Sequence, residues 1–318
     1  MKQEDQMAKI VTLGELLIDL TQKGTDKNGC GEFTAYPGGA PANVAVAAAR
    51  LGADTGFIGK VGNDAFGRSL ADTLKKEGVD ISGLYVSEHP TTMAIVSVDE
   101  RGERSFSFYR DPGADTQLTV GEAIAAVKMN RPAVLHVGSL SMTTSPSREA
   151  CVEAVKYAKE NGALISYDPN YREALWDSKE KAEEMMRRLL PYTDILKVSD
   201  EEMEMLAWVS DPEKGSRILA DNGISMVLVT LGADGVFVRM GENIARVPGF
   251  RTEVADTNGA GDTFLGAMLA QIISETTHSE DGWADLLSMV RYANKAASLT
   301  CSRSGAIPAM PYADEVTL

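Results

Sequence analysis

Residues 256–263 read Asp-Thr-Asn-Gly-Ala-Gly-Asp-Thr and run directly into the apolar segment 264–270, whose pattern predicts a helix. Gly259, Ala260 and Gly261 would begin that helix, where backbone N–H groups lack partners within the helix and bind anions. Glycine leaves room for a phosphate and tolerates positive φ angles. Asp262 falls in the expected first turn, in reach of a hydroxyl held beside that anion. The stretch predicts a phosphoryl-transfer site, with the three amides as anion hole and Asp262 as base.

A simpler interpretation of the same residues is a loop-to-helix turn in which Asp262 only complements the helix dipole. A Gly-x-Gly pair alone favours that simpler interpretation. The choice between the two depends on whether the rest of the chain supplies a sugar site and a nucleotide site beside it.

Composition bounds the class of protein. The chain has 318 residues, 44% of them hydrophobic, enough for one large domain with a small attached flap. The 46 Asp and Glu residues exceed the 31 Lys and Arg residues, giving a net charge of −15. This balance argues against nucleic acid or an anionic membrane as the main partner. A nucleotide can still bind, because local donors and Mg²⁺ decide its affinity.

The cysteines and the first residues indicate a cytoplasmic protein. Cys30, Cys151 and Cys301 are far apart and are expected to be reduced thiols, and no Cys/His spacing suggests a tightly bound transition metal. Residues 1–8 are polar and acidic, without the apolar core of a signal peptide, and are expected to be a disordered leader. No segment has the length of a membrane span.

Alternating strand and helix patterns predict the fold class. Buried strands are expected from Ile10 through Asp19 and at 55–62, 134–137, 164–167, 195–198 and 227–230, with helices at 64–78, 147–160, 178–190 and 200–221 between several of them. This pattern predicts one α/β domain over 9–318, a doubly wound, mainly parallel sheet with helices on both faces. Residues 91–98 and 105–109 alternate instead as a hairpin. A small β-sheet lid is expected from about 15–37 and 90–112.

Candidate ligand-binding residues follow the predicted strands, where such sheets bind ligands. Asp19 could accept hydrogen bonds from two sugar hydroxyls, and Gly38, Gly39 and Asn43 combine close backbone approach with an amide. Arg172 could bind a hydroxyl or a carboxylate. Each has a bland alternative: a surface turn residue, a glycine turn before a helix, or a loop arginine paired on the surface.

The nucleotide side has a similar ambiguity. Glu202 follows Ser199 at a helix start, where it either caps the helix or holds Mg²⁺ through water. Residues 230–235, with Gly232 and Gly235, form either a plain hairpin turn or the floor beneath a nucleotide.

Taken together, these pieces resemble one family. In order and spacing they resemble the ribokinase and fructokinase family of sugar kinases, also called the phosphofructokinase B family, and its fructokinases above all. The resemblance rests on Asp19, the runs 37–45, 59–67, 108–110, 168–172 and 197–202, and the octet 256–263. The resemblance covers about residues 9–312. It implies a ribokinase-like fold and favours the functional interpretation of each motif above.

The resemblance also implies roles for single residues. Asp262 corresponds to the catalytic base, and the amides of Gly259, Ala260 and Gly261 to the anion hole. Sugar contacts correspond to Asp19, Gly38, Gly39, Asn43 and Arg172, with Arg110 on the lid. The nucleotide side corresponds to Lys197, Thr230, Gly232, Gly235 and Asn294. Mg²⁺ would be held through water by Glu202, whereas Ser199 departs from the family's Asn. A K⁺ site would use Asp256 and the carbonyls of Asn258, Thr300, Arg303 and Gly305.

The function that this implies is an ATP-dependent sugar kinase, foremost one that phosphorylates fructose at its primary hydroxyl to give fructose 6-phosphate. The first alternative is a 2-keto-3-deoxygluconate kinase, because Arg110 and Arg172 could together bind an acid's carboxylate. A nucleoside kinase and a catalytically silent sugar-binding relative are further alternatives. A homodimer through the lid is expected, since a small sheet with an aromatic face seldom stands alone.

Overall fold

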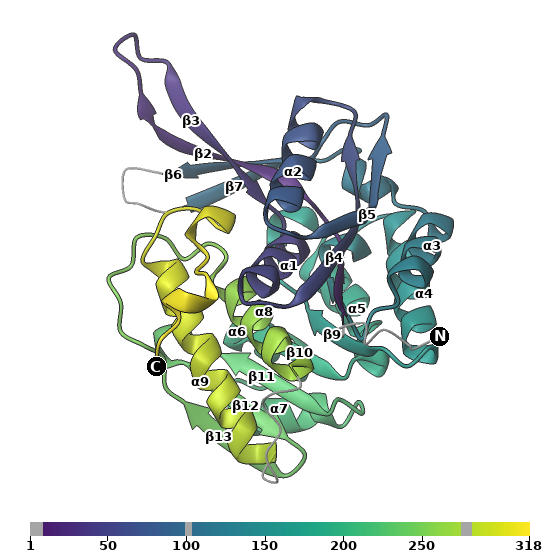
Figure 1. The fold of residues 1–318 in the computed structure, drawn as a ribbon, viewed down its shortest axis with the longest axis vertical. Coiled ribbons are helices and arrows are strands. Elements are labelled where there is room, and N and C mark those ends of the chain that lie inside the picture. The colour runs from purple at the N-terminus through teal and green to yellow at the C-terminus, as the bar shows by residue number, and fades with distance from the viewer. Residues whose placement is uncertain (1–8, 99–103, 275–281) are drawn as a thin grey trace, which may run out of the picture.

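The computed structural model describes residues 9–98, 104–274 and 282–318, so the expected leader and the turn of the hairpin at 99–103 lie outside the described residues. In the described part of the chain, one large sheet has the order β13-β12-β11-β10-β9-β8-β1-β4-β5 (Figure 1). The pairings from β5 across to β11 are parallel, and those of β12 and β13 are antiparallel. The strands are β1 (Lys9–Leu13), β4 (Asp54–Gly62), β5 (Asp80–Ser87), β8 (Val134–Gly138), β9 (Leu164–Asp168), β10 (Ile195–Ser199), β11 (Met226–Thr230), β12 (Val236–Met240) and β13 (Asn243–Val247).

Helices cover both faces of this sheet because successive side chains of each strand point to opposite sides. Ile10 packs into a core with α1, α8 and α9, whereas its neighbour Val11 packs into a second core with α3 to α7. The predicted doubly wound, mainly parallel sheet is confirmed. The helices are α1 (Ala40–Arg50), α2 (Ala65–Lys76), α3 (Val120–Asn130), α4 (Ser147–Glu160), α5 (Lys179–Arg187), α6 (Asp200–Ala207), α7 (Pro212–Ala220), α8 (Ala260–Ile273) and α9 (Gly282–Cys301).

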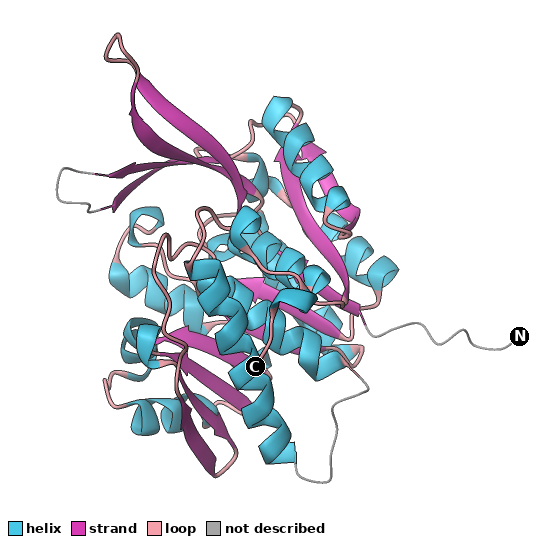
Figure 2. Cartoon of the chain, turned by 60° about the vertical axis from the view of Figure 1, so that its left-hand side comes forward, coloured by secondary structure: helices cyan, strands magenta, loops and turns pink. Residues whose placement is uncertain are grey.

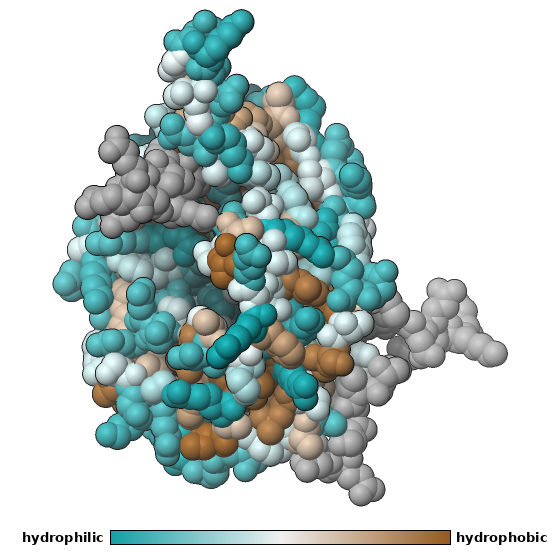
Figure 3. Space-filling model, turned by 90° about the vertical axis from the view of Figure 1, so that its left-hand side faces the viewer, coloured by the Kyte–Doolittle hydropathy of each residue, from teal (hydrophilic) through white to brown (hydrophobic). Residues whose placement is uncertain are grey.

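A second, small sheet stands apart from the large one. It contains β2 (Leu17–Thr25), β3 (Gly31–Gly38), β6 (Met93–Val98) and β7 (Arg104–Tyr109), in the order β3-β2-β6-β7. The predicted hairpin is the antiparallel pair β6 and β7, while β2 and β6 pair in parallel. Figure 2 shows the sheet projecting from the body, with the β2–β3 end farthest away. Seen from that side, the surface beneath the small sheet is hollowed and hydrophilic (Figure 3).

The single strand expected from Ile10 to Asp19 is wrong. The chain leaves the large sheet after Leu13 and enters the small sheet at Leu17. Gly14 lets Pro41 of α1 pack against this connection, since a Cβ there would lie 2.5 Å from the Pro41 side chain. Leu16, Leu17 and Ile18 continue the apolar pattern of β1, so the pattern gave no sign that the chain changes sheets. Asp19 therefore lies within β2, opposite Tyr36 and Ala94, rather than after the first strand.

The sequence pattern also missed β5 and α3, which complete one edge of the large sheet. The helix expected at 178–190 is α5, which ends earlier, at Arg187. None of the helices within the described ranges is both long enough and apolar enough to span a bilayer.

Candidate active site

Asp262 lies in the first turn of α8, as the sequence predicts. Its side chain is buried and accepts a hydrogen bond from Asn43 Nδ2 at 2.8 Å and another from Asn170 Nδ2 at 3.3 Å. Asn43 reaches it because α1 and α8 pack closely at Gly266, where a Cβ would lie only 2.7 Å from that of Ala47. The carboxylate is thus fixed by two amides from distant parts of the chain.

The glycines around it are required by the local geometry. Gly259 precedes α8 with a φ of 77°, a conformation that other residues rarely adopt. A Cβ at Gly261 would lie 3.0 Å from Lys197 Nζ, so glycine lets the ammonium approach the helix start. The N–H of Ala260 donates to the Thr257 carbonyl at 3.3 Å, so this amide of the predicted anion hole has a partner in the loop. A cation and a positive helix end therefore face the same point.

A cavity beside Asp262 lies between the two sheets. The small sheet contributes Leu17, Asp19, Ala94 and Phe108. The body contributes Glu15, Gly39, Ala40, Asn43, Leu140, Asn170, Arg172, Asn258 and Asp262. The wall is rich in carboxyl, amide and guanidinium groups, a lining that suits a ligand with many hydroxyls.

Four of the predicted sugar residues line this cavity: Asp19, Gly39, Asn43 and Arg172. Gly38 stands behind Asp19, where a Cβ would lie 2.4 Å from the carboxylate oxygen. Gly39 caps α1 with a φ of 109°, and a Cβ there would meet the Glu15 carbonyl at 2.4 Å. These glycines therefore create the space in which the polar side chains meet.

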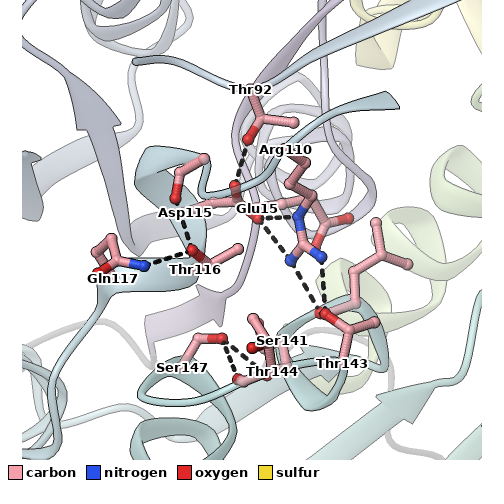
Figure 4. Close-up of polar contacts among 12 residues, drawn as sticks. Glu15, Thr92, Arg110, Asp115, Thr116, Gln117, Ser141, Thr143, Thr144 and Ser147 are labelled. Carbon is pink, nitrogen blue, oxygen red and sulfur yellow. Dashed lines mark hydrogen bonds and ion pairs between the residues drawn. The ribbon is translucent and has the colours of Figure 1, made fainter. Parts of the chain in front are cut away.

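Arg110 is placed differently from its expected role. Its guanidinium pairs with Asp115 at 2.7 Å and donates to Thr143 Oγ1 at 2.7 Å and to the Leu140 carbonyl at 3.0 Å (Figure 4). It does not line the cavity. Arg110 fastens the end of β7 to the body, and among the residues that the structure describes Arg172 supplies the guanidinium on the cavity wall.

The two cavity aspartates have unusual proton affinities. Burial raises the pKa of Asp262 to about 6, against the opposing effects of the Asn43 hydrogen bond and of Lys197, while Asp168 raises it further. Burial likewise raises the pKa of Asp19 to about 6, opposed by Asn258 and Arg172. A buried carboxylate that titrates near 6 is a competent general base near neutral pH.

Lys197 and Glu202 extend the site toward the end of β10. Lys197 Nζ is buried and bonds Asp168 Oδ2 at 2.7 Å. Burial alone would lower the pKa of Lys197, but the Asp168 and Glu202 carboxylates outweigh it and raise that pKa. Glu202 accepts the N–H of Tyr171 at 2.7 Å and that of Ser199 at 2.8 Å, completing a capping box. Its burial raises its pKa.

The remaining predicted nucleotide residues gather at the same end of the sheet. Thr230 is the register partner of Ser199, and its hydroxyl donates to the Val198 carbonyl at 3.3 Å. Gly232 and Gly235 both have positive φ, and Gly235 lies where a Cβ would be 2.1 Å from the Val247 carbonyl. Asn294 of α9 bonds that same carbonyl at 3.2 Å.

The predicted K⁺ residues form one loop cluster beside α8. Asp256 accepts the N–H of Asn258 at 2.9 Å and that of Gly305 at 3.2 Å. Thr300 contacts Thr263 of α8 through its hydroxyl at 2.9 Å, and its carbonyl accepts the Arg303 N–H at 3.1 Å. The Arg303 side chain pairs outward with Glu315. In the described ranges, no cluster of three His, Cys, Asp or Glu side chains is arranged to hold a metal ion.

Sequence reasoning missed three residues of this site. Asn170 and Asp168 belong to the run 168–172, but their contacts with Asp262 and Lys197 join residues far apart in the chain. Glu15 gave one signal, a lone acid inside an apolar segment. Nothing local indicated that it would line the cavity.

Comparison with known proteins agrees with this geometry. The chain is 40% identical over 311 residues to fructokinase-1 of Zea mays, covering 96% of both. A fructokinase with bound ATP from Xylella fastidiosa has a TM-score of 0.87 at 34% identity, covering 97% of this chain and 96% of that one. A Vibrio cholerae fructokinase in fructose, ADP and calcium ion bound form has a TM-score of 0.85 at 35% identity, covering 98% of each chain. The model of the pfkB family carbohydrate kinase matches residues 7–313, and the chain therefore belongs to this family of carbohydrate kinases.

Proposed function

We propose that this protein is an ATP-dependent fructokinase that phosphorylates the primary hydroxyl at C6 of fructose. The observation that carries the proposal is Asp262, a buried carboxylate with a pKa of about 6 on the wall of a polar cavity and in the first turn of a glycine-led helix. The similarity to fructokinases over nearly the whole chain supports fructose as the substrate.

In the proposed reaction, Asp19, Asn43 and Arg172 hold the sugar with its primary hydroxyl beside Asp262. Asp262 accepts the hydroxyl proton as the oxygen attacks the γ-phosphoryl group in line, and the bond from the γ-phosphorus to the bridging oxygen breaks to release ADP. The amides at the start of α8 and the Lys197 ammonium, which faces Gly261, stabilise the charge on the transferred group. We propose that the small sheet acts as a lid, since its residues form one wall of the cavity and its closure would exclude water.

Mg²⁺ and K⁺ are part of this proposal. Glu202 suits Mg²⁺ held through water, because each of its oxygens accepts a single backbone N–H and retains a lone pair. When bound, Mg²⁺ would neutralise charge on the nucleotide phosphates. For K⁺, the loop cluster around Asp256 offers a carboxylate and carbonyl oxygens beside the start of α8.

The placement of Arg110 bears on the choice of sugar. A 2-keto-3-deoxygluconate kinase was the main alternative because two arginines could bind the acid's carboxylate. Arg110 is instead engaged by Asp115, Thr143 and Leu140, and among the described residues only Arg172 brings a guanidinium to the cavity wall. A single guanidinium among several carboxyl groups suits a neutral polyol better than an anion.

We also propose a homodimer joined through the small sheets, in a cytoplasmic enzyme. Phe33 and Tyr109 lie on the outer strands β3 and β7 and are 48% and 60% exposed. Unpaired strand edges with exposed aromatic side chains favour pairing with a second copy. Cys30, Cys151 and Cys301 are free thiols, in keeping with a reducing compartment.

Coupled measurement of ADP release tests the proposed activity. Fructose and 2-keto-3-deoxygluconate would be compared in parallel with Mg-ATP, with and without K⁺, and without Mg²⁺. We expect turnover with fructose that requires Mg²⁺ and is faster with K⁺. Turnover with the acid and none with fructose would refute the proposed substrate. ATP turnover with neither, alongside sugar binding, would indicate a silent relative.

A further inference from the structure

Glu15 is a buried carboxyl group on the wall of the same cavity. It lies in the short segment that joins β1 to β2 and is 2% exposed. Its Oε1 accepts the N–H of Ala40, the first residue of α1, at 3.0 Å. Its Oε2 is buried and, in the structure of residues 9–98, 104–274 and 282–318, has no hydrogen-bond partner.

Capping α1 does not account for this side chain. One oxygen is enough to bond the Ala40 N–H, and a Ser or Asn side chain caps a helix without burying a second oxygen. A buried polar atom without a partner destabilises a protein, because it gives up its hydrogen bonds to water and gains none in return. An unsatisfied oxygen on a residue that lines a ligand cavity points to the ligand as its partner.

The surroundings of Glu15 favour its neutral form. Asp115 binds the Arg110 guanidinium and also accepts the Thr92 hydroxyl, so the positive charge nearest to Glu15 already has a carboxylate (Figure 4). Burial raises the pKa of Glu15 to about 7, with a further increase from Asp115 and opposing effects from the backbone N–H of Glu15 itself, from Arg110 and from the Ala40 N–H. A neutral Glu15 that accepts through Oε1 presents Oε2 as a hydroxyl donor.

Glu15 and Asp262 face different parts of the cavity. Glu15 contacts α1 at Ala40, whereas Asp262 is bonded by Asn43, three residues further along the helix, about 4.5 Å in rise. The charges that act on Glu15 are Asp115 and Arg110, and those that act on Asp262 are Asp168, Lys197 and Arg172. Glu15 therefore meets a different hydroxyl of the sugar from the one that meets Asp262.

We propose that Glu15 is a sugar-recognition residue whose Oε2 donates a hydrogen bond to a hydroxyl at the end of the acceptor remote from Asp262. The inference deepens the proposed fructokinase function and rests on it. For fructose phosphorylated at C6, this hydroxyl is the one on C1. Glu15 would then select ketohexoses that carry it.

Two substitutions and one substrate analogue test this contact. Glu15→Met keeps the unbranched shape and removes both oxygens, while Glu15→Gln keeps an acceptor for Ala40 and places an N–H donor where Oε2 lies. Calorimetry would give the dissociation constants of fructose and 1-deoxyfructose for the wild type and both variants. Steady-state kinetics would give the KM for fructose and for ATP, and thermal melting would report folding.

We expect Glu15→Met to weaken fructose binding by about tenfold to a hundredfold and to leave the KM for ATP unchanged. Glu15→Gln should bind fructose within about threefold of the wild type, since it restores the donor. The wild type should bind 1-deoxyfructose weakly, and Glu15→Met should weaken that binding no further. This non-additivity is the signature of direct contact, which a purely structural role would not produce.

Wild-type affinity of Glu15→Met for fructose, or an equal further loss for fructose and 1-deoxyfructose, would overturn the proposal. If Glu15→Met does not fold, Glu15→Gln decides: a loss of fructose affinity of tenfold or more, with the fold intact, would refute a donated hydrogen bond. Absence of fructose turnover by the wild type would instead refute the proposed function itself.

Discussion

Replacing Asp262 by Asn should remove most of the turnover while leaving the protein at least as stable as the wild type. The substitution preserves size and takes away the proton acceptor. Asn43 Nδ2 donates to the Asp262 carboxylate, and Asn43 Oδ1 has no partner within the described residues. A reoriented Asn43 amide can therefore bond either group of the new Asn, and the local packing is retained.

The expected loss of activity follows from the role of a general base. Such groups typically contribute a factor of about 10² to 10⁴ to the rate. We expect kcat to fall by that factor, with the KM for fructose and for ATP within about threefold of the wild type. The wild-type rate should itself fall as the pH drops through about 6, where Asp262 becomes protonated.

The expected change in stability has the opposite sign. Burial raises the pKa of Asp262 from 3.8 to about 6, so the ionised form destabilises the folded state by up to about 3 kcal/mol. The carboxylic acid form is favoured in the fold, and its contribution is fully present below pH 3.8 and is lost as the pH rises through about 6. At pH 7 the Asn variant avoids the penalty of burying the charge.

Coupled ADP release and urea unfolding at pH 5 and pH 7 would measure both effects. We expect the stability gain of Asp262→Asn to be larger at pH 7 than at pH 5. Wild-type turnover by a folded Asp262→Asn protein would refute the assignment of the base. A variant less stable than the wild type by more than about 1 kcal/mol at pH 7 would refute the argument from buried charge.

Three further substitutions test the packing of the site. Gly261→Ala should lower kcat by about tenfold with a stability change under about 1 kcal/mol, because a Cβ would lie 3.0 Å from the movable end of Lys197; kinetics and melting check this, and an unchanged kcat would contradict it. Lys197→Met should lower the free energy of unfolding by about 3–5 kcal/mol in denaturant, because it leaves the Asp168 carboxylate without its ion-pair partner. Adding Asp168→Asn should restore part of the lost stability, and additive effects of the two substitutions would refute this coupling. Gly266→Val should destabilise the protein by about 1–3 kcal/mol and also lower kcat, because its Cβ would meet that of Ala47 at 2.7 Å and move α1, with Asn43, away from Asp262. A loss of stability with an unchanged kcat would refute the link between the packing of α1 on α8 and catalysis.

Much of the fold and part of the site could be predicted from the sequence because their signals are local. Apolar strands that alternate with amphipathic helices predict a parallel sheet covered on both faces, and this prediction requires no knowledge of long-range contacts. The turn and helix start at the octet 256–263 could likewise be predicted from the sequence, since the glycines, the helix start and Asp262 are neighbours in the chain. These features are set by backbone geometry over a few residues.

Which side chains meet at the cavity depends on contacts between distant segments of the chain. The change of sheets between Leu13 and Leu17 is invisible in the largely apolar run 10–18, and it places Asp19 in the wall of the cavity. Arg110 matched a motif on the lid, yet Asp115 and Thr143 bind its guanidinium, and it does not line the cavity. Glu15 carried no motif, and its place against α1 follows from long-range packing. The glycine turn before α8 and the layered sheet could be read from the sequence alone, because both arise from local backbone preferences. The partners of each buried charge depend on contacts between distant segments, which only the folded chain brings together.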